Sequence, residues 1–135
     1  MARQINNIKL IMFSILFFPA LVSAAEGTDP CFDEQGSYAI SACLDRKIEV
    51  AKKDYNTARK SFVAEISKNL EGNKKFNKLE QRSNKNWLSF LESNCEMQAF
   101  IAGDKDSTIF QTEYQRCILD HYKDRIKLFK SNMNM

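Results

Sequence analysis

The chain has 135 residues, and its 20 lysines and arginines nearly balance its 17 aspartates and glutamates, for a formal net charge of +3. This length is enough for one domain with a modest core. The near-neutral balance gives no dense basic face of the kind that nucleic-acid binding requires, so we expect no nucleic-acid partner.

The N-terminal segment has the pattern of a secretory signal peptide. Basic residues precede a nearly continuous apolar run over residues 10–21, and Val22-Ser23-Ala24 places small residues where a signal peptidase cuts. The run is too short to span a membrane, and no cysteine follows it that could carry a lipid anchor. We therefore expect a signal peptide over residues 1–24, a single domain over residues 25–135, and a periplasmic protein without stable membrane insertion.

The four cysteines all follow the predicted cleavage site. They are Cys31, Cys43, Cys95 and Cys117. An even number of cysteines in a small exported chain indicates disulfides and an oxidising compartment. Even the two that are nearest in sequence, Cys31 and Cys43, are much further apart than the close pair that begins a zinc site, so we expect no metal.

The first half of the domain predicts an arm followed by one long helix. Residues 26–36 are polar and contain glycine and proline, which predicts an extended arm, and Ser37 is a candidate N-cap. Apolar residues then recur every three or four positions to about residue 70, and Gly72-Asn73 is a helix stop. The stripe consists of Leu44, Ile48, Ala51, Tyr55, Ala58, Phe62, Ile66 and Leu70.

The second half predicts two further helices. One runs from about Lys74 to Ala102 and lacks apolar residues over 80–86, so a kink or loose turn is an alternative there. Its stripe consists of Phe76, Leu79, Trp87, Phe90, Leu91, Met97 and Ile101. After a loop over residues 103–106, Ser107 or Thr108 can cap the last helix, which we expect to fray from residue 131 onward. The stripe of this helix consists of Phe110, Tyr114, Cys117, Ile118, His121, Arg125 or Ile126, and Phe129.

Three amphipathic helices joined by short turns, with no alternating strand pattern, predict an all-α antiparallel three-helix bundle. The depth of each cysteine in the bundle then indicates its partner. Cys95 precedes Gly103 by about two helical turns, and Cys117 follows Thr108 by about two and a half. At the helical rise these separations are about 12 Å and about 13–14 Å, so the two cysteines stand level.

The alternative pairing across the first turn is mismatched. Counted from Gly72-Asn73, Cys43 lies about eight helical turns back along the chain and Cys95 lies about six turns forward. The mismatch is on the order of 10 Å, which is too far for a disulfide between level helices. We therefore predict the disulfides Cys31–Cys43 and Cys95–Cys117.

The charges are unevenly distributed along the predicted bundle. Residues 92–113 carry five acidic residues and one lysine, and the arm adds Asp29, Asp33 and Glu34, which antiparallel packing places at the same end. Residues 68–85 and 123–130 make the opposite end basic. Such a molecule has an acidic pole that would steer it toward a cationic partner, although these charges also suit ordinary solvated faces.

No set of side chains in the sequence forms a catalytic constellation. His121 is the only histidine and stands four residues from Cys117, but that cysteine is assigned to a disulfide. Glu92 and Glu96 are one helical turn apart, which is more typical of surface charge than of a glycosidase pair. We therefore expect no enzyme and no cofactor.

The segment Trp87-x-x-Phe90-x-Glu92-x-x-Cys95 resembles the Trp-x-x-Tyr-Arg-Asp-x-x-Cys pattern of the LprI-type lysozyme-inhibitor family. Two further groups of residues are similar to the family's flanking patterns. They are Cys43, Ala51 and Tyr55-Asn56 upstream, and Cys117, Arg125 and Phe129 downstream. The chain departs from the family where Leu91 replaces an arginine, Lys52 an aspartate and His121 an apolar residue.

The resemblance implies a periplasmic protein that blocks lysozyme and thereby protects the cell wall. Lysozymes of the animal type are cationic, so the acidic pole is a suitable docking face, and our hypothesis is that Asp104, Lys105 and Asp106 contact the enzyme. Two alternatives remain open: an immunity protein that neutralises a toxin effector delivered to the periplasm, and an envelope assembly factor.

Overall fold

The computed structural model describes residues 29–70 and 73–133. The predicted signal peptide over residues 1–24 lies outside this part of the chain. The described elements are the 3₁₀ helix η1 (Pro30–Asp33) and the α-helices α1 (Ser37–Asn69), α2 (Asn73–Ala102) and α3 (Thr108–Met133).

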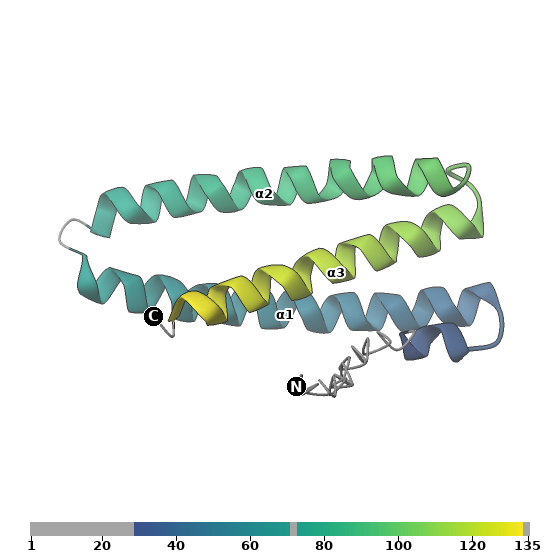
Figure 1. The fold of residues 1–135 in the computed structure, drawn as a ribbon, viewed down its shortest axis with the longest axis horizontal. Helices are drawn as coiled ribbons and strands as arrows, with labels where there is room; N and C mark the ends of the chain where they lie inside the picture. Colours follow the sequence, from purple (N-terminus) through teal and green to yellow (C-terminus); the bar gives the residue numbers. More distant parts are fainter. Residues whose placement is uncertain (1–28, 71–72, 134–135) are drawn as a thin grey trace, which may run out of the picture.

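The three long helices form the predicted antiparallel bundle, and α3 is its central helix. α1 and α3 run in the same direction and α2 runs against both, with α3 passing between the other two and ending over α1 (Figure 1). No strand occurs in the described residues. None of the described helices is long and apolar enough to cross a membrane.

The predicted apolar stripe of α1 forms one side of the hydrophobic core. Leu44, Ile48, Ala51, Tyr55 and Ala58 are all buried, whereas Leu70 lies beyond the helix end and is exposed. The prediction of Ser37 as N-cap was wrong, because Ser37 is the first helical residue and Gly36 is the N-cap, with no side-chain hydrogen bond.

Helix α3 buries more of its surface than the sequence predicted. Beyond the expected Phe110, Ile118 and Phe129, it also buries Leu119 and Tyr122. A helix between two neighbours contacts them on two sides, so one apolar stripe underestimates its buried face. The helix also continues to Met133, so the fraying predicted from residue 131 is not seen as far as that residue.

Aromatic rings join the three helices at the centre of the bundle. Trp87 of α2 stacks on Tyr55 of α1 at 4.9 Å and meets Tyr122 of α3 edge to face at 5.5 Å. The guanidinium of Arg125 lies over the Trp87 ring, 5.5 Å from its centroid. Burial raises the pKa of the Tyr55 and Tyr122 hydroxyls. Trp87 and Arg125, which carry part of the sequence resemblance, are therefore in contact and contribute to the core.

The gap in apolar residues on α2 is a polar contact surface, and α2 is continuous through it. Glu80 accepts two hydrogen bonds of 2.6 Å from Arg59 of α1, and Asn84 accepts one from the Tyr55 hydroxyl. Asn77 lies 3.4 Å from the Ser67 hydroxyl. These bonds hold α2 against α1 where apolar side chains are missing, so neither a kink nor a loose turn forms.

Both predicted disulfides are present. Cys31–Cys43 ties η1 to α1, and Cys95–Cys117 ties α2 to α3, with Cα–Cα distances of 5.6 and 5.5 Å. The arm before α1 was predicted to be extended, but its described part contains η1, whose N-cap Asp29 accepts a hydrogen bond from the Cys31 amide.

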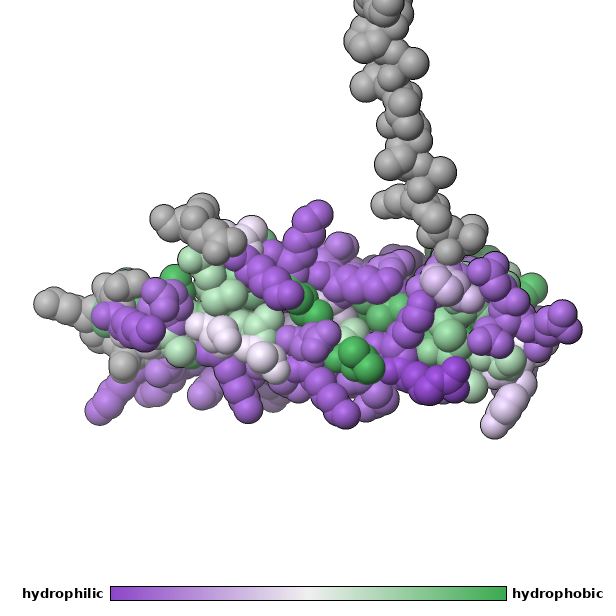
Figure 2. All heavy atoms as spheres, turned by 90° about the horizontal axis from the view of Figure 1, so that it is seen from below, coloured by the Kyte–Doolittle hydropathy of each residue, from purple (hydrophilic) through white to green (hydrophobic). Residues whose placement is uncertain are grey.

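The side of the bundle seen in Figure 2 is mainly hydrophilic, with hydrophobic groups showing between the charged side chains.

Candidate functional site

The loop between α2 and α3 forms an ordered tip at one end of the bundle (Figure 1). The Gly103 amide donates to the Ala99 carbonyl at 3.1 Å, and the Ser107 amide donates to the Asp104 carbonyl at 2.8 Å. The Ser107 hydroxyl accepts from the Phe110 amide at 3.1 Å, so Ser107 is the side-chain cap of α3. These hydrogen bonds give the loop a defined backbone before any partner binds.

Gly103 lies against the cap of α3 where this loop leaves α2. A Cβ built on Gly103 would lie 2.7 Å from the Ser107 hydroxyl oxygen, which is closer than side-chain carbons approach such an atom. A larger residue would therefore make the Ser107 hydroxyl shift, and the cap of α3 would have to readjust. The turn and the helix cap are therefore in contact at this position.

The three predicted contact residues Asp104, Lys105 and Asp106 are all exposed at this tip. The Lys105 amine lies 3.0 Å from Glu96 on α2, and its hydrogen bond to that carboxylate raises the pKa of the lysine. Within the described residues, neither Asp104 nor Asp106 has a side-chain ion pair or hydrogen bond. The tip therefore presents two unpaired carboxylates on either side of a lysine that is already engaged.

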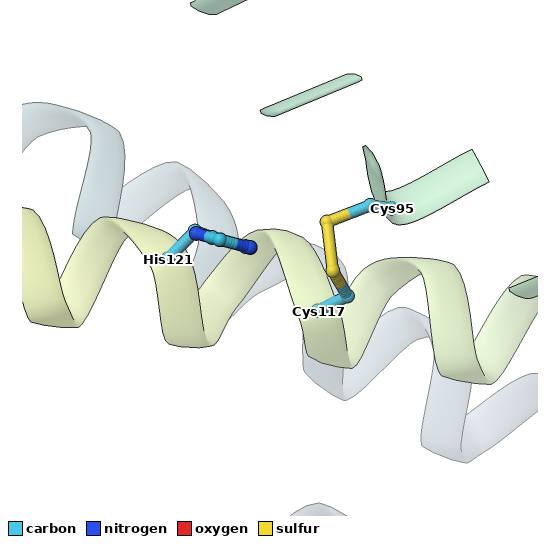
Figure 3. A group of neighbouring side chains, drawn as sticks. All are labelled: Cys95, Cys117 and His121. Atoms are coloured by element: carbon cyan, nitrogen blue, oxygen red, sulfur yellow. A yellow bond between two sulfur atoms is a disulfide. The ribbon is translucent and has the colours of Figure 1, made fainter. Parts of the chain in front are cut away.

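The disulfide Cys95–Cys117 braces the two helices behind the tip, and His121 lies beside it. In Figure 3 the cysteines bridge α2 and α3, and His121 stands one turn further along α3. The sulfurs and an imidazole nitrogen lie within 4.8 Å of one another, but the sulfurs are bonded to each other and offer no thiolate to a metal.

The surroundings of His121 show a packed residue. Its Nε2 lies 3.1 Å from the Asn94 side-chain amide, and its ring meets Phe90 edge to face at 6.1 Å. These contacts hold the imidazole between the two helices, which is the ordinary role of a lone histidine on an apolar helix stripe. Its place next to the disulfide follows from the spacing of four residues on α3.

The end of the bundle that the sequence predicted to be the acidic pole, called here the acidic end, contains most, but not all, of the aspartates and glutamates assigned to it. Residues 92–113 surround the tip. Asp29 does not lie there, because its carboxylate pairs with Lys47 on α1 and reaches Lys123 on α3 at 3.8 Å. The Cys31–Cys43 disulfide ties the arm to α1, and Asp29 therefore lies beside Lys47 and Lys123.

Part of the predicted stripe on α2 is wrong, because several of its large apolar residues face solvent. Phe90, Met97 and Ile101 are 54%, 58% and 82% exposed. The predicted Leu91 is buried and the predicted Trp87 packs against the core, and the core face of α2 is completed by Cys95 and Ala99, which are fully buried. Two small residues thus face the neighbouring helices, a feature that a search for large apolar side chains overlooks.

Apolar side chains of the tip are the part of the candidate site that the sequence analysis missed. Ile101 precedes the loop, and Ile109, which follows it, is 58% exposed. The Ile109 side chain lies 3.5 Å from the Cβ position built on Gly103, so it borders the turn itself. Exposed apolar groups beside charged ones are typical of protein-binding surfaces.

A family model with the description "Lysozyme inhibitor LprI" matches residues 29–128. The match begins just before η1, includes all four cysteines and the tip, and ends near the C-terminal end of α3. No curated protein and no solved structure matches the chain. Because the family model covers most of its length, the chain belongs to the LprI family of lysozyme inhibitors.

Proposed function

We propose that this protein is a periplasmic lysozyme inhibitor that protects the cell wall by docking on a cationic lysozyme through Asp104, Lys105 and Asp106. One observation carries the proposal beyond the family: two unpaired carboxylates stand exposed on an ordered loop at the acidic end of the bundle. The two disulfides suit an oxidising compartment, which supports the periplasmic location.

The tip is suited to electrostatic docking. A partner with positive surface charge is attracted to the acidic end as a whole, which raises the association rate. On contact, Asp104 and Asp106 can pair with lysines or arginines of the enzyme without first breaking an ion pair of their own. Lys105 would exchange Glu96 for a carboxylate of the enzyme.

The order of the loop contributes to affinity. A flexible loop loses conformational freedom when it binds, and this loss weakens the complex. Here the turn is already closed by backbone hydrogen bonds, the Ser107 cap and the disulfide behind it. Ile101 and Ile109 provide apolar area beside the acids, which adds a salt-independent part to the binding free energy.

The direct test replaces Asp104 and Asp106 with asparagine in the disulfide-bonded protein and measures residual lysozyme activity at low and moderate salt. We expect the inhibition constant to rise about tenfold or more at low salt, because two charge-assisted contacts are lost. The difference from the wild type should shrink at moderate salt, since screening weakens the same contacts.

A matched control separates a local effect from an effect of net charge. Asp54 and Asp124 are exposed, form no ion pair within the described chain and lie away from the tip, so Asp54→Asn/Asp124→Asn removes the same charge elsewhere. This control should inhibit like the wild type. Equal inhibition by the tip variant and the wild type at both salt concentrations would remove the loop from the docking surface. Absence of inhibition by the wild type itself would contradict the proposed function and favour the immunity-protein alternative.

A further inference from the structure

The outward face of α2 carries an apolar pattern that the bundle leaves mostly exposed. Positions 76, 79, 83, 86, 90, 93, 97 and 100 follow one another at alternating steps of three and four, which is the heptad spacing of a coiled-coil seam. Its four large apolar residues other than Phe76 are 46–63% exposed. They are Leu79, Phe90, Met97 and Phe100.

This face, called here the outer seam, contains no charged residue. Its remaining positions are Ser83, Asn86 and Ser93, all exposed, and Phe76, which is half-buried against Phe62 of α1. The core of the bundle lies on the other side of the helix, where Leu91, Cys95 and Ala99 are buried. α2 therefore has two separate apolar faces, and the described chain covers only one of them.

The charges beside the outer seam reverse along the helix. The residues that border the outer seam on its solvent-exposed side are Lys75, Arg82, Ser89 and Glu96. This border is basic near the start of α2 and acidic near its end. Arg82 forms no ion pair within the described residues. Glu96 is exposed and pairs only with the exposed Lys105. Such a border is complementary to a second copy of itself running in the opposite direction.

We propose that two copies of this chain pair through their outer seams, with the α2 helices antiparallel. The register that places Arg82 of each copy beside Glu96 of the other also places Met97 opposite Leu79 and Phe100 opposite Phe76. Each of these contacts occurs twice in the symmetric pair. Two features agree on this register: the pairing of apolar residues at the two ends of the seam and the reversal of charge beside it.

The middle of the seam sets the strength of the pair. Ser83 of one copy faces Ser93 of the other, and Phe90 faces Asn86, so the central layers bury little apolar area. The dimer is therefore reversible and depends on protein concentration. In the same register, the loop over residues 103–107 projects past the start of the other copy's α2 at Asn73. The two tips are then free at opposite ends of the dimer.

The test measures molecular mass in solution, by light scattering and sedimentation equilibrium, over a dilution series of the disulfide-bonded protein. The wild type should change from dimer to monomer on dilution. Arg82→Glu and Glu96→Arg should each raise the dimer dissociation constant by on the order of tenfold or more, because each places like charges together twice. The double variant Arg82→Glu/Glu96→Arg should restore dimerisation, since the pair is re-formed with its charges exchanged.

Control variants keep the result interpretable. Lys85→Glu and Glu92→Lys change exposed charges of α2 away from the outer seam and should dimerise like the wild type. Met97→Glu should be monomeric, and circular dichroism and the thermal midpoint should show that it is folded. A wild type that is monomeric at every concentration, or a double variant that fails to recover, overturns the proposal.

The outcome is independent of lysozyme inhibition, because mass is measured without the enzyme. Asp104→Asn/Asp106→Asn should dimerise normally even though it inhibits poorly. If the wild type is monomeric and Met97→Glu weakens inhibition instead, the outer seam binds the enzyme and the dimer is wrong.

Discussion

Asp29 links the arm to both α1 and α3, and its charge makes the stability of the fold depend on pH. Hydrogen bonds from Lys47 and from the Cys31 amide lower its pKa below the ordinary 3.8. A lowered pKa in the folded state stabilises the fold above the unfolded-state pKa, and this contribution is lost as the pH falls through the folded-state value. Asp29→Asn should therefore reduce the free energy of unfolding by about 1 kcal/mol at neutral pH.

The same variant should approach the wild type as the pH falls from the ordinary 3.8 through the lowered folded-state pKa, because below that value Asp29 is neutral in the folded wild type as well. Urea denaturation across a pH series measures the difference directly. A difference that stays constant from neutral to acidic pH would show that the charge of Asp29 is not its source.

Gly36 is the other single residue on which a local structure depends. It caps α1 with φ +93° and ψ 142°, a backbone region open almost only to glycine. No atom lies within 4 Å of a Cβ built there, so the cost of a side chain is backbone strain alone. Gly36→Ala should lower the free energy of unfolding by on the order of 1–3 kcal/mol.

Gly36→Asn is the informative companion to that variant. Asparagine tolerates the left-handed helical region, but ψ 142° lies outside it, so asparagine should be no better than alanine. Thermal and urea unfolding of both variants measure this. Recovery by asparagine would mean that the cap adopts an ordinary left-handed turn.

At the level of the helices, the contact between α1 and α2 depends on Arg59 and Glu80. The Glu80 side chain is only 11% exposed and accepts both of its 2.6 Å bonds from Arg59. Arg59→Leu leaves this carboxylate unpaired and should cost about 2–3 kcal/mol of stability. Arg59→Leu/Glu80→Leu should recover most of that loss, because paired apolar residues need no compensating charge.

A double-mutant cycle by chemical denaturation gives the coupling energy between the two positions. Additive losses from the two single substitutions would contradict a direct pairing. The cycle also tests why α2 stays straight between residues 80 and 86, where the sequence offers no apolar side chain.

The sequence predicted the helices that have one apolar face more accurately than those with two. The stripe of α1 is buried from Leu44 to Ala58 as predicted, because one regular set of residues meets the core, although Leu70 at its end is exposed. On α2, the predicted stripe combined Leu91, which is buried, with Phe90 and Met97, which are exposed, and it left out the small residues Cys95 and Ala99 that complete the core face. Periodicity identifies an apolar face but does not say which neighbour will cover it.

For the whole molecule, Cys95–Cys117 was predictable because helical rise fixes how far each of these cysteines lies from the turn, and this pairing left Cys31 for Cys43. The position of α3 between the other two helices was not, since nothing in its stripe distinguishes one neighbour from two. The residues of the tip were predicted as a loop, but its exposed Ile101 and Ile109 were not recognised as a surface. Their exposure depends on how the three helices are arranged, which local patterns do not determine.

The two disulfides should contribute similarly to stability but differently to function. They close loops of 12 and 22 residues, each worth about 3 kcal/mol in the chain-entropy model. Cys31–Cys43 ties the arm to α1, whereas Cys95–Cys117 holds together the two helices that carry the tip. Alanine at both members of either pair should therefore lower the unfolding midpoint by a similar amount.

Inhibition of lysozyme should separate the two variants at a temperature where both are folded. Without Cys95–Cys117 the ends of α2 and α3 can move apart, so the tip must be ordered on binding and inhibition should weaken several-fold. Without Cys31–Cys43, the Cys95–Cys117 disulfide still holds α2 and α3 together behind the tip, and inhibition should match that of the wild type. Hydrogen exchange of the Gly103 and Ser107 amides is an independent measurement, because both amides donate hydrogen bonds within the tip. Both should exchange faster only in the variant that lacks Cys95–Cys117. Equal inhibition by both variants, with unchanged exchange at the tip, would show that the order of the loop does not depend on the disulfide behind it.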